Sequence, residues 1–199
     1  MITSRKELKE CLRKDAVANK RNSIHRRIYA DDIWKFIWLL RVNEYYSHVN
    51  GIKRLMLYPI ILLRKFQFYR MSILLNYTIP LNIIGPGLSL AHPGTIVING
   101  NCRIGNNCRI QTGVTLGSTN GNSEAPKLGN NIFLGDGCKL IGDITIADNV
   151  QIGANAVVIK DITEKSTTWG GVPARKISNN GSISNLAPAI QKEIMDGKN

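Results

Sequence analysis

Three histidines are the side chains of this sequence that exchange protons near neutral pH, and one of them lies in a setting that suggests catalysis. His25 and His48 fall in a strongly basic N-terminal part of the chain. His92 belongs instead to the short run Ala91-His92-Pro93-Gly94. A neutral imidazole can accept a proton from a hydroxyl group and so act as a general base. A single histidine is often structural, however, so the elements that hold His92 decide between the two interpretations.

The element around His92 is a six-residue repeat. Apolar residues recur at every sixth position from Ile98 to Leu116 and, after one gap of twelve, from Leu128 to Val158. Neither the 3.6-residue period of a helix nor the two-residue period of a strand explains this spacing. Short repeats of this kind are typical of a parallel β-helix, in which three hexads close one triangular coil. We therefore predict a mostly β fold built on a parallel β-helix.

The repeat is interrupted at two places. Coil-like sequence runs over residues 84–90, but the next anchor, Ile98, arrives two residues late, so the turn at 92–95 is expected to be irregular. A polar, glycine-containing stretch at 118–127 is expected to protrude as a loop. Because the regular coils serve as scaffold, an irregular turn is a typical place for a functional residue. This position favours a catalytic role for His92.

No sequence pattern indicates another kind of active site. Hexapeptide coils include metal-dependent hydratases, but these need three histidines around zinc and the coil holds only His92, so no metal site is expected. No Ser-His-Asp or Cys-His arrangement can be identified. The four cysteines, Cys11, Cys102, Cys108 and Cys138, lack paired spacing, and the last three fall at inward positions of the repeat. They are expected to be small buried side chains without disulfides.

The charge is concentrated before the coil. Residues 1–75 hold sixteen Lys or Arg and six Asp or Glu, a net of +10 out of +12. We expect a basic helical segment at 1–76, the coil at 77–165 and a tail at 166–199 with a short helix at 188–195. The first thirty residues are charged and the longest apolar run is too short to span a bilayer, so a cytoplasmic location is expected. A basic, aromatic segment could also contact the inner face of a membrane.

The stretch at 84–98, with its Ala-His-Pro-Gly turn, resembles the catalytic stretch of the serine acetyltransferase family. The resemblance continues through residues 111–117, 152–158 and the Gly-Val-Pro-Ala-Arg run at 171–175, and it covers about half the chain. Members of that family are left-handed parallel β-helix enzymes that use acetyl-CoA. They are trimers whose site lies in the cleft between adjacent coils. The resemblance therefore implies a left-handed coil, an acetyl-CoA donor and a homotrimer.

The resemblance also implies roles for five residues. His92 would be the general base that deprotonates the acceptor hydroxyl, while backbone N–H groups would stabilise the oxyanion. Gly117, Ala154, Lys160 and Arg175 would contact the cofactor. The two cations are suitable partners for the CoA phosphates, although each could equally be an ordinary surface charge.

Three positions depart from the family pattern. The family has Asp immediately before the catalytic His and again about fifteen residues upstream, where this chain has Ala91 and Tyr77. A second His of the family corresponds to Ala125. A pocket without these carboxylates has little to hold the ammonium group of L-serine, and a phenol is a weak substitute for the Asp that orients the base. The departures favour a neutral acceptor. The run Ile79-Pro80 without an Asp, preceded by the basic, aromatic N-terminal segment, resembles the acetyltransferases of capsule, exopolysaccharide and O-antigen clusters.

We therefore predict an acetyl-CoA-dependent O-acetyltransferase acting on a hydroxyl of a saccharide or sugar precursor. The alternative within the same class is O-acetylation of L-serine in cysteine biosynthesis. A second alternative is a catalytically inactive β-helix scaffold, against which His92 and the Gly-Val-Pro-Ala-Arg run argue. A nucleic-acid partner is not expected, because the basic segment carries no recognisable reader motif.

Overall fold

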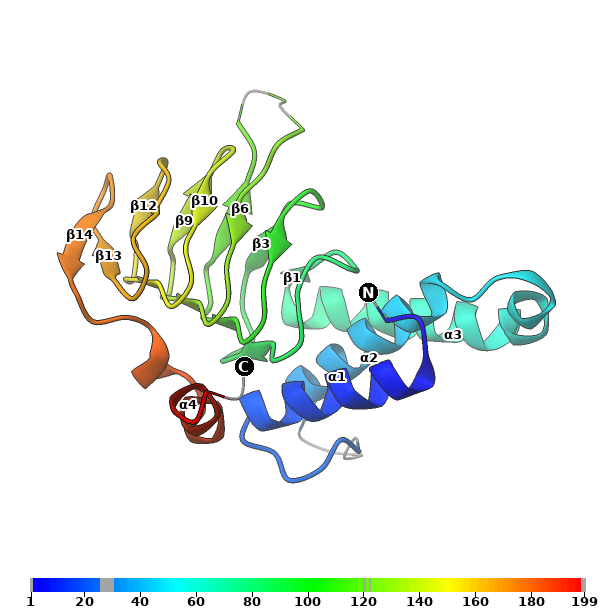
Figure 1. Ribbon diagram of the computed structural model, residues 1–199. Helices are drawn as coiled ribbons and strands as arrows, with labels where there is room; N and C mark the ends of the chain where they lie inside the picture. Colours follow the sequence, from blue (N-terminus) through cyan, green and yellow to red (C-terminus); the bar gives the residue numbers. More distant parts are fainter. Residues whose placement is uncertain (1, 26–30, 120, 122, 198–199) are drawn as a thin grey trace.

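A layer of helices lies against one end of a β-helix (Figure 1). The computed structural model describes every residue except 1, 26–30, 120, 122 and 198–199. The helices that precede the coil are α1 (Arg5–Ala18), α2 (Asp32–Ser47) and α3 (Gly51–Leu75). After the coil, a 3-10 turn (Ile183–Asn185) leads to α4 (Pro188–Met195), which packs beside α1. The short C-terminal helix expected at 188–195 is confirmed.

The coil has three faces, each a sheet of short strands. The five-stranded sheet contains, in spatial order, β1 (Tyr77–Thr78), β3 (Ile96–Ile98), β6 (Thr115–Gly117), β9 (Lys139–Ile141) and β12 (Val157–Val158). The three-stranded sheet contains β4 (Arg103–Ile104), β7 (Lys127–Leu128) and β10 (Thr145–Ile146). The six-stranded sheet contains β2 (Ser89–Leu90), β5 (Arg109–Ile110), β8 (Phe133–Leu134), β11 (Gln151–Ile152), β13 (Thr168–Gly170) and β14 (Arg175–Ser178). The parallel pairing among these strands confirms the parallel β-helix.

Strand register locates both interruptions of the repeat. A regular coil advances eighteen residues, as in the pairing of Lys139 with Val157. Ser89 pairs with Arg109, an advance of twenty, so two extra residues lie in the coil that contains the turn at 92–95. Arg109 pairs with Phe133, an advance of twenty-four, because the loop between β6 and β7 adds six. Within that loop, residues 120 and 122 lie outside the described part of the chain.

The coil extends further than its apolar repeat. Parallel pairing with β11 carries the six-stranded sheet on to β13, past the boundary expected at residue 165. Strand β14 then folds back antiparallel to β13 and forms the last edge of that sheet. The regular anchors stop at Val158, whereas the hydrogen bonds of the coil continue through Gly170.

Every anchor of the repeat is buried, and so is the second series that contains the coil cysteines. All four cysteines are buried and free. The expectation of a mostly β protein is wrong by residue count, because helices account for 35% of the described residues and strands for 19%. In each hexad, only two or three residues form a strand and the others form a corner of the coil. Three long helices also precede the coil.

A buried ion network joins the helices to the first coil. Arg41 of α2 binds Asp15 of α1 with Nε–Oδ2 at 2.7 Å and also binds Glu44 at 3.0 Å. The same guanidinium donates to the carbonyls of Ile84 at 2.8 Å and Gly85 at 2.7 Å. Asp15 in turn accepts the backbone N–H groups of residues 87 and 88. These backbone groups belong to the first coil, where no preceding coil can pair with them, so the helices replace the missing neighbour.

Helix α3 continues through Pro59. Proline removes one hydrogen bond of a helix, and here the freed carbonyl belongs to Leu55, which is exposed, so water can satisfy it. The helix ends at Asn76, whose left-handed conformation (φ 60°) closes the last turn. No helix within the described residues is long and apolar enough to span a membrane.

Candidate active site

His92 lies on the irregular turn between β2 and β3, and its side chain is exposed. Within the described residues, its ring has no hydrogen-bond partner, so both nitrogens are open to a ligand. The backbone around it is held firmly. The N–H of Ala91 donates to Ile110 at 3.1 Å and the N–H of Gly94 donates to Leu75 at 3.1 Å. The turn therefore presents a free imidazole on a fixed backbone.

Gly94 is the residue that permits this turn. Its φ of +145° lies in a region that L-residues rarely adopt, and a Cβ there would come within 3.0 Å of the Thr112 side chain in the next coil. Beside it, the side chain of Asn76 donates to the hydroxyl of Thr95 at 2.7 Å. The C-terminus of α3 and the turn are thus built as one unit.

Tyr77 does not orient the imidazole. Its hydroxyl donates to the backbone carbonyl of His92 at 2.7 Å, so it fixes the turn and leaves the ring free. Burial raises the pKa of Tyr77 to about 12, which keeps the phenol protonated at any physiological pH. The sequence shows a tyrosine at position 77 but does not show which atom of His92 its hydroxyl contacts.

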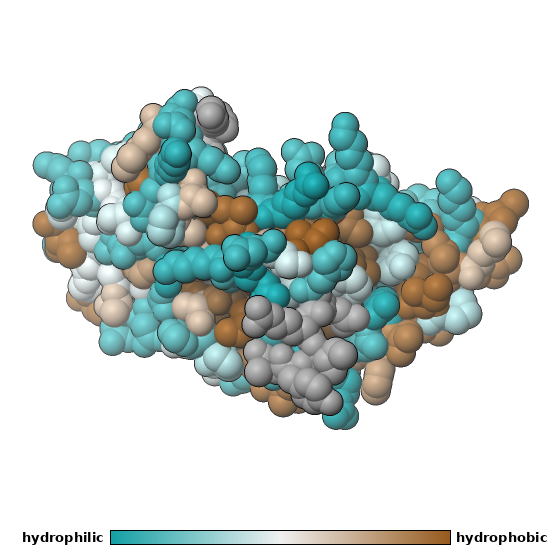
Figure 2. All heavy atoms as spheres, turned by 90° about the horizontal axis from the view of Figure 1, so that it is seen from below, coloured by the Kyte–Doolittle hydropathy of each residue, from teal (hydrophilic) through white to brown (hydrophobic). Residues whose placement is uncertain are grey.

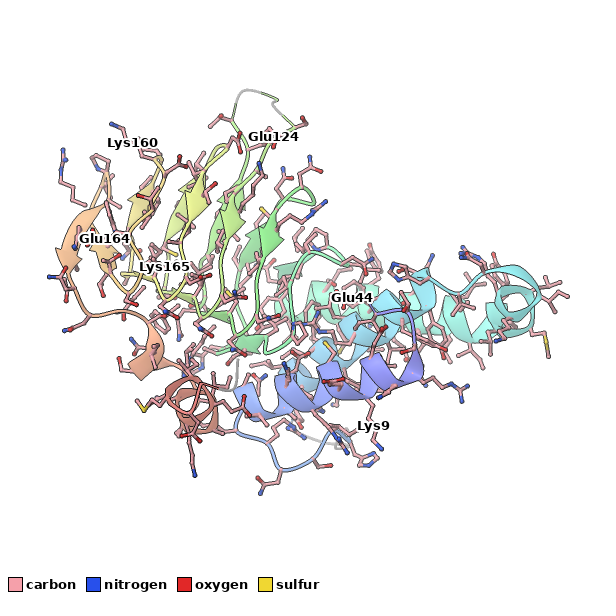
Figure 3. The ribbon with its side chains drawn as sticks, in the orientation of Figure 1. Lys9, Glu44, Glu124, Lys160, Glu164 and Lys165 are labelled. Carbon is pink, nitrogen blue, oxygen red and sulfur yellow. The ribbon has the colours of Figure 1, made fainter. Side chains whose placement is uncertain are left out.

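The other four predicted residues divide between two edges of the five-stranded sheet. Ala154 lies on the connection from β11 to β12, the same corner of the triangle as the connection from β2 to β3 that carries His92. Arg175 pairs with Gly170 at that corner. Gly117 ends β6 and Lys160 follows β12, so both lie at the opposite edge of the sheet. Figure 3 shows Lys160 and Glu124 at this outer edge, away from the helices.

A single chain therefore does not bring all five residues together. The turns of His92 and Ala154 are separated by three strand spacings, from β3 to β12, or about 14 Å along the coil axis. Lys160 lies across the width of the sheet from both. Lys160 and Arg175 are exposed, and neither is paired with a carboxylate among the described residues. Whether these residues contact a cofactor remains a prediction.

Carboxylates are scarce around His92. The sequence has no Asp or Glu between Glu44 and Glu124. The acidic residue on the corner of His92 is Asp136, two coils away, and it accepts a hydrogen bond from Thr112 Oγ1. Ala125, which stands where the family has a second histidine, is buried at 1% exposure and contributes to the core. The missing side chains are therefore not replaced from nearby positions in the same chain.

A hollow of about 480 Å³ lies between the end of α3 and β1. It shares Asn76 and Tyr77 with the unit that holds the His92 turn. Its lining is aromatic, aliphatic, hydroxyl and amide in character and includes no charged side chain: Tyr69, Ser72, Ile73, Asn76, Tyr77, Thr78, Ile79 and Pro80. Sequence reasoning did not find this hollow, because it depends on how α3 packs against β1.

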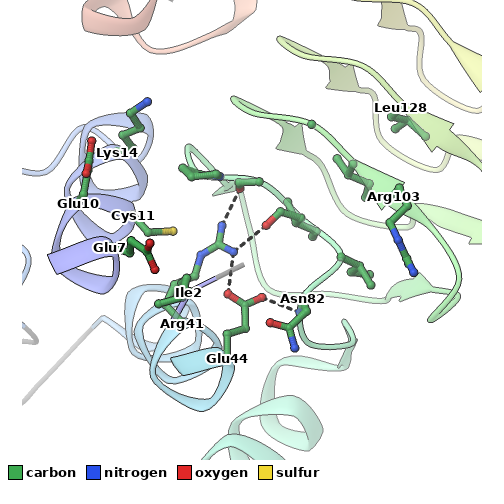
Figure 4. A pocket seen from close by; sticks show the side chains of 16 residues that line it. Ile2, Glu7, Glu10, Cys11, Lys14, Arg41, Glu44, Asn82, Arg103 and Leu128 are labelled. Atoms are coloured by element: carbon green, nitrogen blue, oxygen red, sulfur yellow. Dashed lines mark hydrogen bonds and ion pairs between the residues drawn. The ribbon is translucent and has the colours of Figure 1, made fainter. Parts of the chain in front are cut away.

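A larger cavity, of about 600 Å³, lies between α1, α2 and the first coils (Figure 4). Arg41 and Glu44 face it, joined by the ion pair and hydrogen bonds described above. None of the five predicted site residues lines this cavity. Arg41, Glu44 and Asn82 in its lining hold the helices to the coil, so we assign it to the structural junction and not to the site.

Comparisons with known proteins support a hexapeptide repeat in the coil. Residues 125–160 match the family model "Bacterial transferase hexapeptide (six repeats)". A serine acetyltransferase of Synechococcus elongatus is 39% identical over 100 residues, which are 49% of this chain and 41% of that protein. One of Helicobacter pylori is 43% identical over 89 residues, 44% of this chain and 52% of that protein.

Among solved structures, the serine acetyltransferase of Neisseria gonorrhoeae in complex with serine is 28% identical with a TM-score of 0.63. The match covers 85% of this chain and 69% of that one. The chain spans about half the length of the curated relatives that it matches. These findings support the hexapeptide-repeat acyltransferase family for the coil, with relatives named serine acetyltransferase.

Proposed function

We propose that this protein is an acetyl-CoA-dependent O-acetyltransferase with His92 as its general base. The observation that carries the proposal is an exposed imidazole on a fixed, irregular turn of a coil whose relatives are named serine acetyltransferase. The base removes the proton of the acceptor hydroxyl while its oxygen attacks the thioester carbonyl. The C–S bond then breaks, the imidazolium returns its proton to the thiolate, and the products are free CoA and an acetyl ester.

The donor subsite in this proposal consists of Gly117, Ala154, Lys160 and Arg175. Lys160 and Arg175 are unpaired exposed cations and suit the CoA phosphates. Because they lie at different edges of the five-stranded sheet, a second copy of the chain would complete the site, as expected for a homotrimer of left-handed coils. The cytoplasm, where acetyl-CoA is available and thiols stay reduced, is the compartment that the proposal assigns.

L-serine is the acceptor that the comparisons favour, because the relatives and the solved neighbour carry that name. In this version of the proposal, backbone groups of the turn, or groups from a second copy, hold the ammonium and carboxylate of serine. The carboxylates expected for that task are absent from positions 77 and 91.

A neutral saccharide hydroxyl is the second candidate, and a specific observation favours it. The hollow beside the His92 turn is lined by aromatic, hydroxyl and amide side chains without charge. Such a lining can stack on a sugar ring and hydrogen-bond its hydroxyls, but it offers nothing to an ammonium group. This candidate keeps His92 and the donor unchanged and differs only in the acceptor.

The test is release of CoA from acetyl-CoA, measured with L-serine and with a panel of nucleotide sugars in parallel. His92→Ala serves as the blank and should lower turnover about 10²–10⁴-fold without unfolding the coil, because the side chain is exposed. His92-dependent release with serine would assign the serine reaction, and release with sugars alone would assign the second candidate. Near-normal turnover of His92→Ala with any accepted acceptor would refute the proposal.

A further inference from the structure

Helix α3 exposes an apolar face that nothing in the described part of the chain covers. Its inner side is marked by Ile61 and Leu75, which are buried. On the opposite side, large apolar side chains are between 48% and 78% exposed and are spaced by three or four residues except for one step of seven: Ile52, Leu55, Leu62, Phe66, Tyr69 and Ile73. Figure 2 shows apolar side chains gathered at the end of the molecule where α3 lies. At about 100° per residue, these positions form one stripe along the helix.

Exposed cations flank this stripe. Arg54, Lys65 and Arg70 are all exposed, and none has an acidic partner among the described residues. Because the sequence has no Asp or Glu between Glu44 and Glu124, α3 and the segment that follows it carry positive charge only. At about 100° per residue, Arg54 and Lys65 border one side of the stripe and Arg70 the other, with exposed Leu63 and Leu74 beyond Arg70, so every charge beside the stripe is positive.

We infer that α3 lies in the interface of an anionic lipid bilayer, with its apolar stripe among the acyl chains and its cations against the headgroups. A flat helix with a broad apolar face and flanking Lys and Arg is the arrangement that binds such surfaces. The aliphatic stems of the flanking side chains can lie along the stripe while their charges reach the lipid phosphates. The helix lies on the bilayer and does not cross it, in agreement with the absence of a spanning helix among the described residues.

Charge distinguishes this occupant from a second copy of the same helix. Packing two α3 stripes together would bring Lys65 and Arg70 of each copy close to cations of the other, and α3 has no carboxylate to neutralise them. Like charges in such positions destabilise helix pairs. An anionic bilayer complements both the apolar centre and the cationic margins. The inference does not depend on the chemistry of His92.

The test is co-sedimentation of the full chain with vesicles of phosphatidylglycerol and phosphatidylcholine, compared with vesicles of phosphatidylcholine alone. We expect binding to the anionic vesicles that weakens as salt is raised. The double change Leu62→Glu with Phe66→Glu removes apolar side chains from the stripe. The double change Lys65→Glu with Arg70→Glu reverses the sign of the charges beside the stripe. Each should lower the partition coefficient at least about tenfold.

Two changes outside α3, one on β14 and one on α4, serve as controls. Ile177→Glu alters an apolar residue that is 66% exposed on β14, and Lys192→Glu reverses an exposed cation on α4. Both should bind vesicles like the unmodified chain, and circular dichroism should show every variant folded. Absence of binding to anionic vesicles at low salt would overturn the inference. So would apolar variants that bind normally but reduce the oligomer mass, because a second copy would then be the occupant.

Discussion

At the scale of single residues, the side chain and the main chain of His92 are in different situations. The imidazole of His92 is free, while Tyr77 and Gly94 hold the backbone beneath it. His92 is therefore positioned through its main chain. This arrangement gives Tyr77 a role that can be distinguished from a catalytic one.

Tyr77→Phe should lower kcat several-fold and leave the KM for acetyl-CoA unchanged. The change removes the hydrogen bond to the His92 carbonyl and should also cost about 1 kcal/mol of unfolding free energy. Tyr58→Phe, which alters an exposed hydroxyl in the middle of α3, is the matched control and should change neither quantity. A loss of stability with unchanged kcat would show that the bond is purely structural.

The buried thiols predict a loss of stability at alkaline pH. Burial raises the pKa of Cys138 from 9.0 to about 12 and that of Cys102 to about 11. The unfolded chain therefore loses these protons first, and the contribution of each thiol is complete below pH 9 and is lost as pH rises toward its folded value. Each thiol should contribute a slope of about 1.4 kcal/mol per pH unit in that window.

Urea unfolding at pH 8, 10 and 11 under reducing conditions measures this slope. Cys138→Ala should flatten it between pH 10 and 11, because one raised pKa is removed. Identical slopes for the two proteins would contradict the assignment of the effect to this thiol.

At the scale of elements, the helices and the coil depend on each other at one junction. The first coil has no preceding coil, and the carbonyls of Ile84 and Gly85 would be unpaired without Arg41. The guanidinium is itself neutralised by Asp15 and Glu44, whose negative charges raise its pKa against the effect of burial. The first helices are therefore part of the coil fold and not an independent attachment.

Arg41→Met should destabilise the protein by about 3–5 kcal/mol, because it leaves two buried carboxylates without their cation. Lys127→Met, which removes an exposed cation from two surface ion pairs, is the control and should cost less than about 1 kcal/mol. Chemical denaturation monitored by tryptophan fluorescence compares the two. Equal effects would show that the junction does not hold the first coil.

At the scale of the whole molecule, a site that contains all the predicted residues would need more than one chain. His92 and Lys160 lie at different edges of the five-stranded sheet, so a site that uses both would form between copies. This arrangement predicts complementation. Chains carrying His92→Ala and chains carrying Lys160→Ala, unfolded and refolded together, should regain activity at low acetyl-CoA concentration.

Each variant refolded alone is the control for this experiment and should remain impaired. In mixed oligomers, some sites combine an intact His92 from one chain with an intact Lys160 from its neighbour. Mixtures no more active than the average of the two separate variants would place both residues in the same site of one chain, or would remove Lys160 from the site.

Much of the fold can be read from the spacing of residues. Burial of one side chain in six, with a corner after each, is a local rule that repeats, so the parallel coil, its loop and its irregular turn follow from periodicity alone. The expectation of a mostly β protein overestimated the strand content, because each hexad contributes only two or three residues to a strand while three long helices precede the coil.

The sequence by itself determined the coil, the placement of His92 on an irregular turn and the concentration of positive charge before the coil. The tertiary structure decided what depends on contacts between distant segments. These are the bond from Tyr77 to the His92 carbonyl, the junction at Arg41, the uncharged hollow at the end of α3 and the exposure of the apolar face of α3. A repeat is encoded locally, whereas each of these contacts requires the helices and the coil to be packed together, and no spacing along the chain specifies that packing.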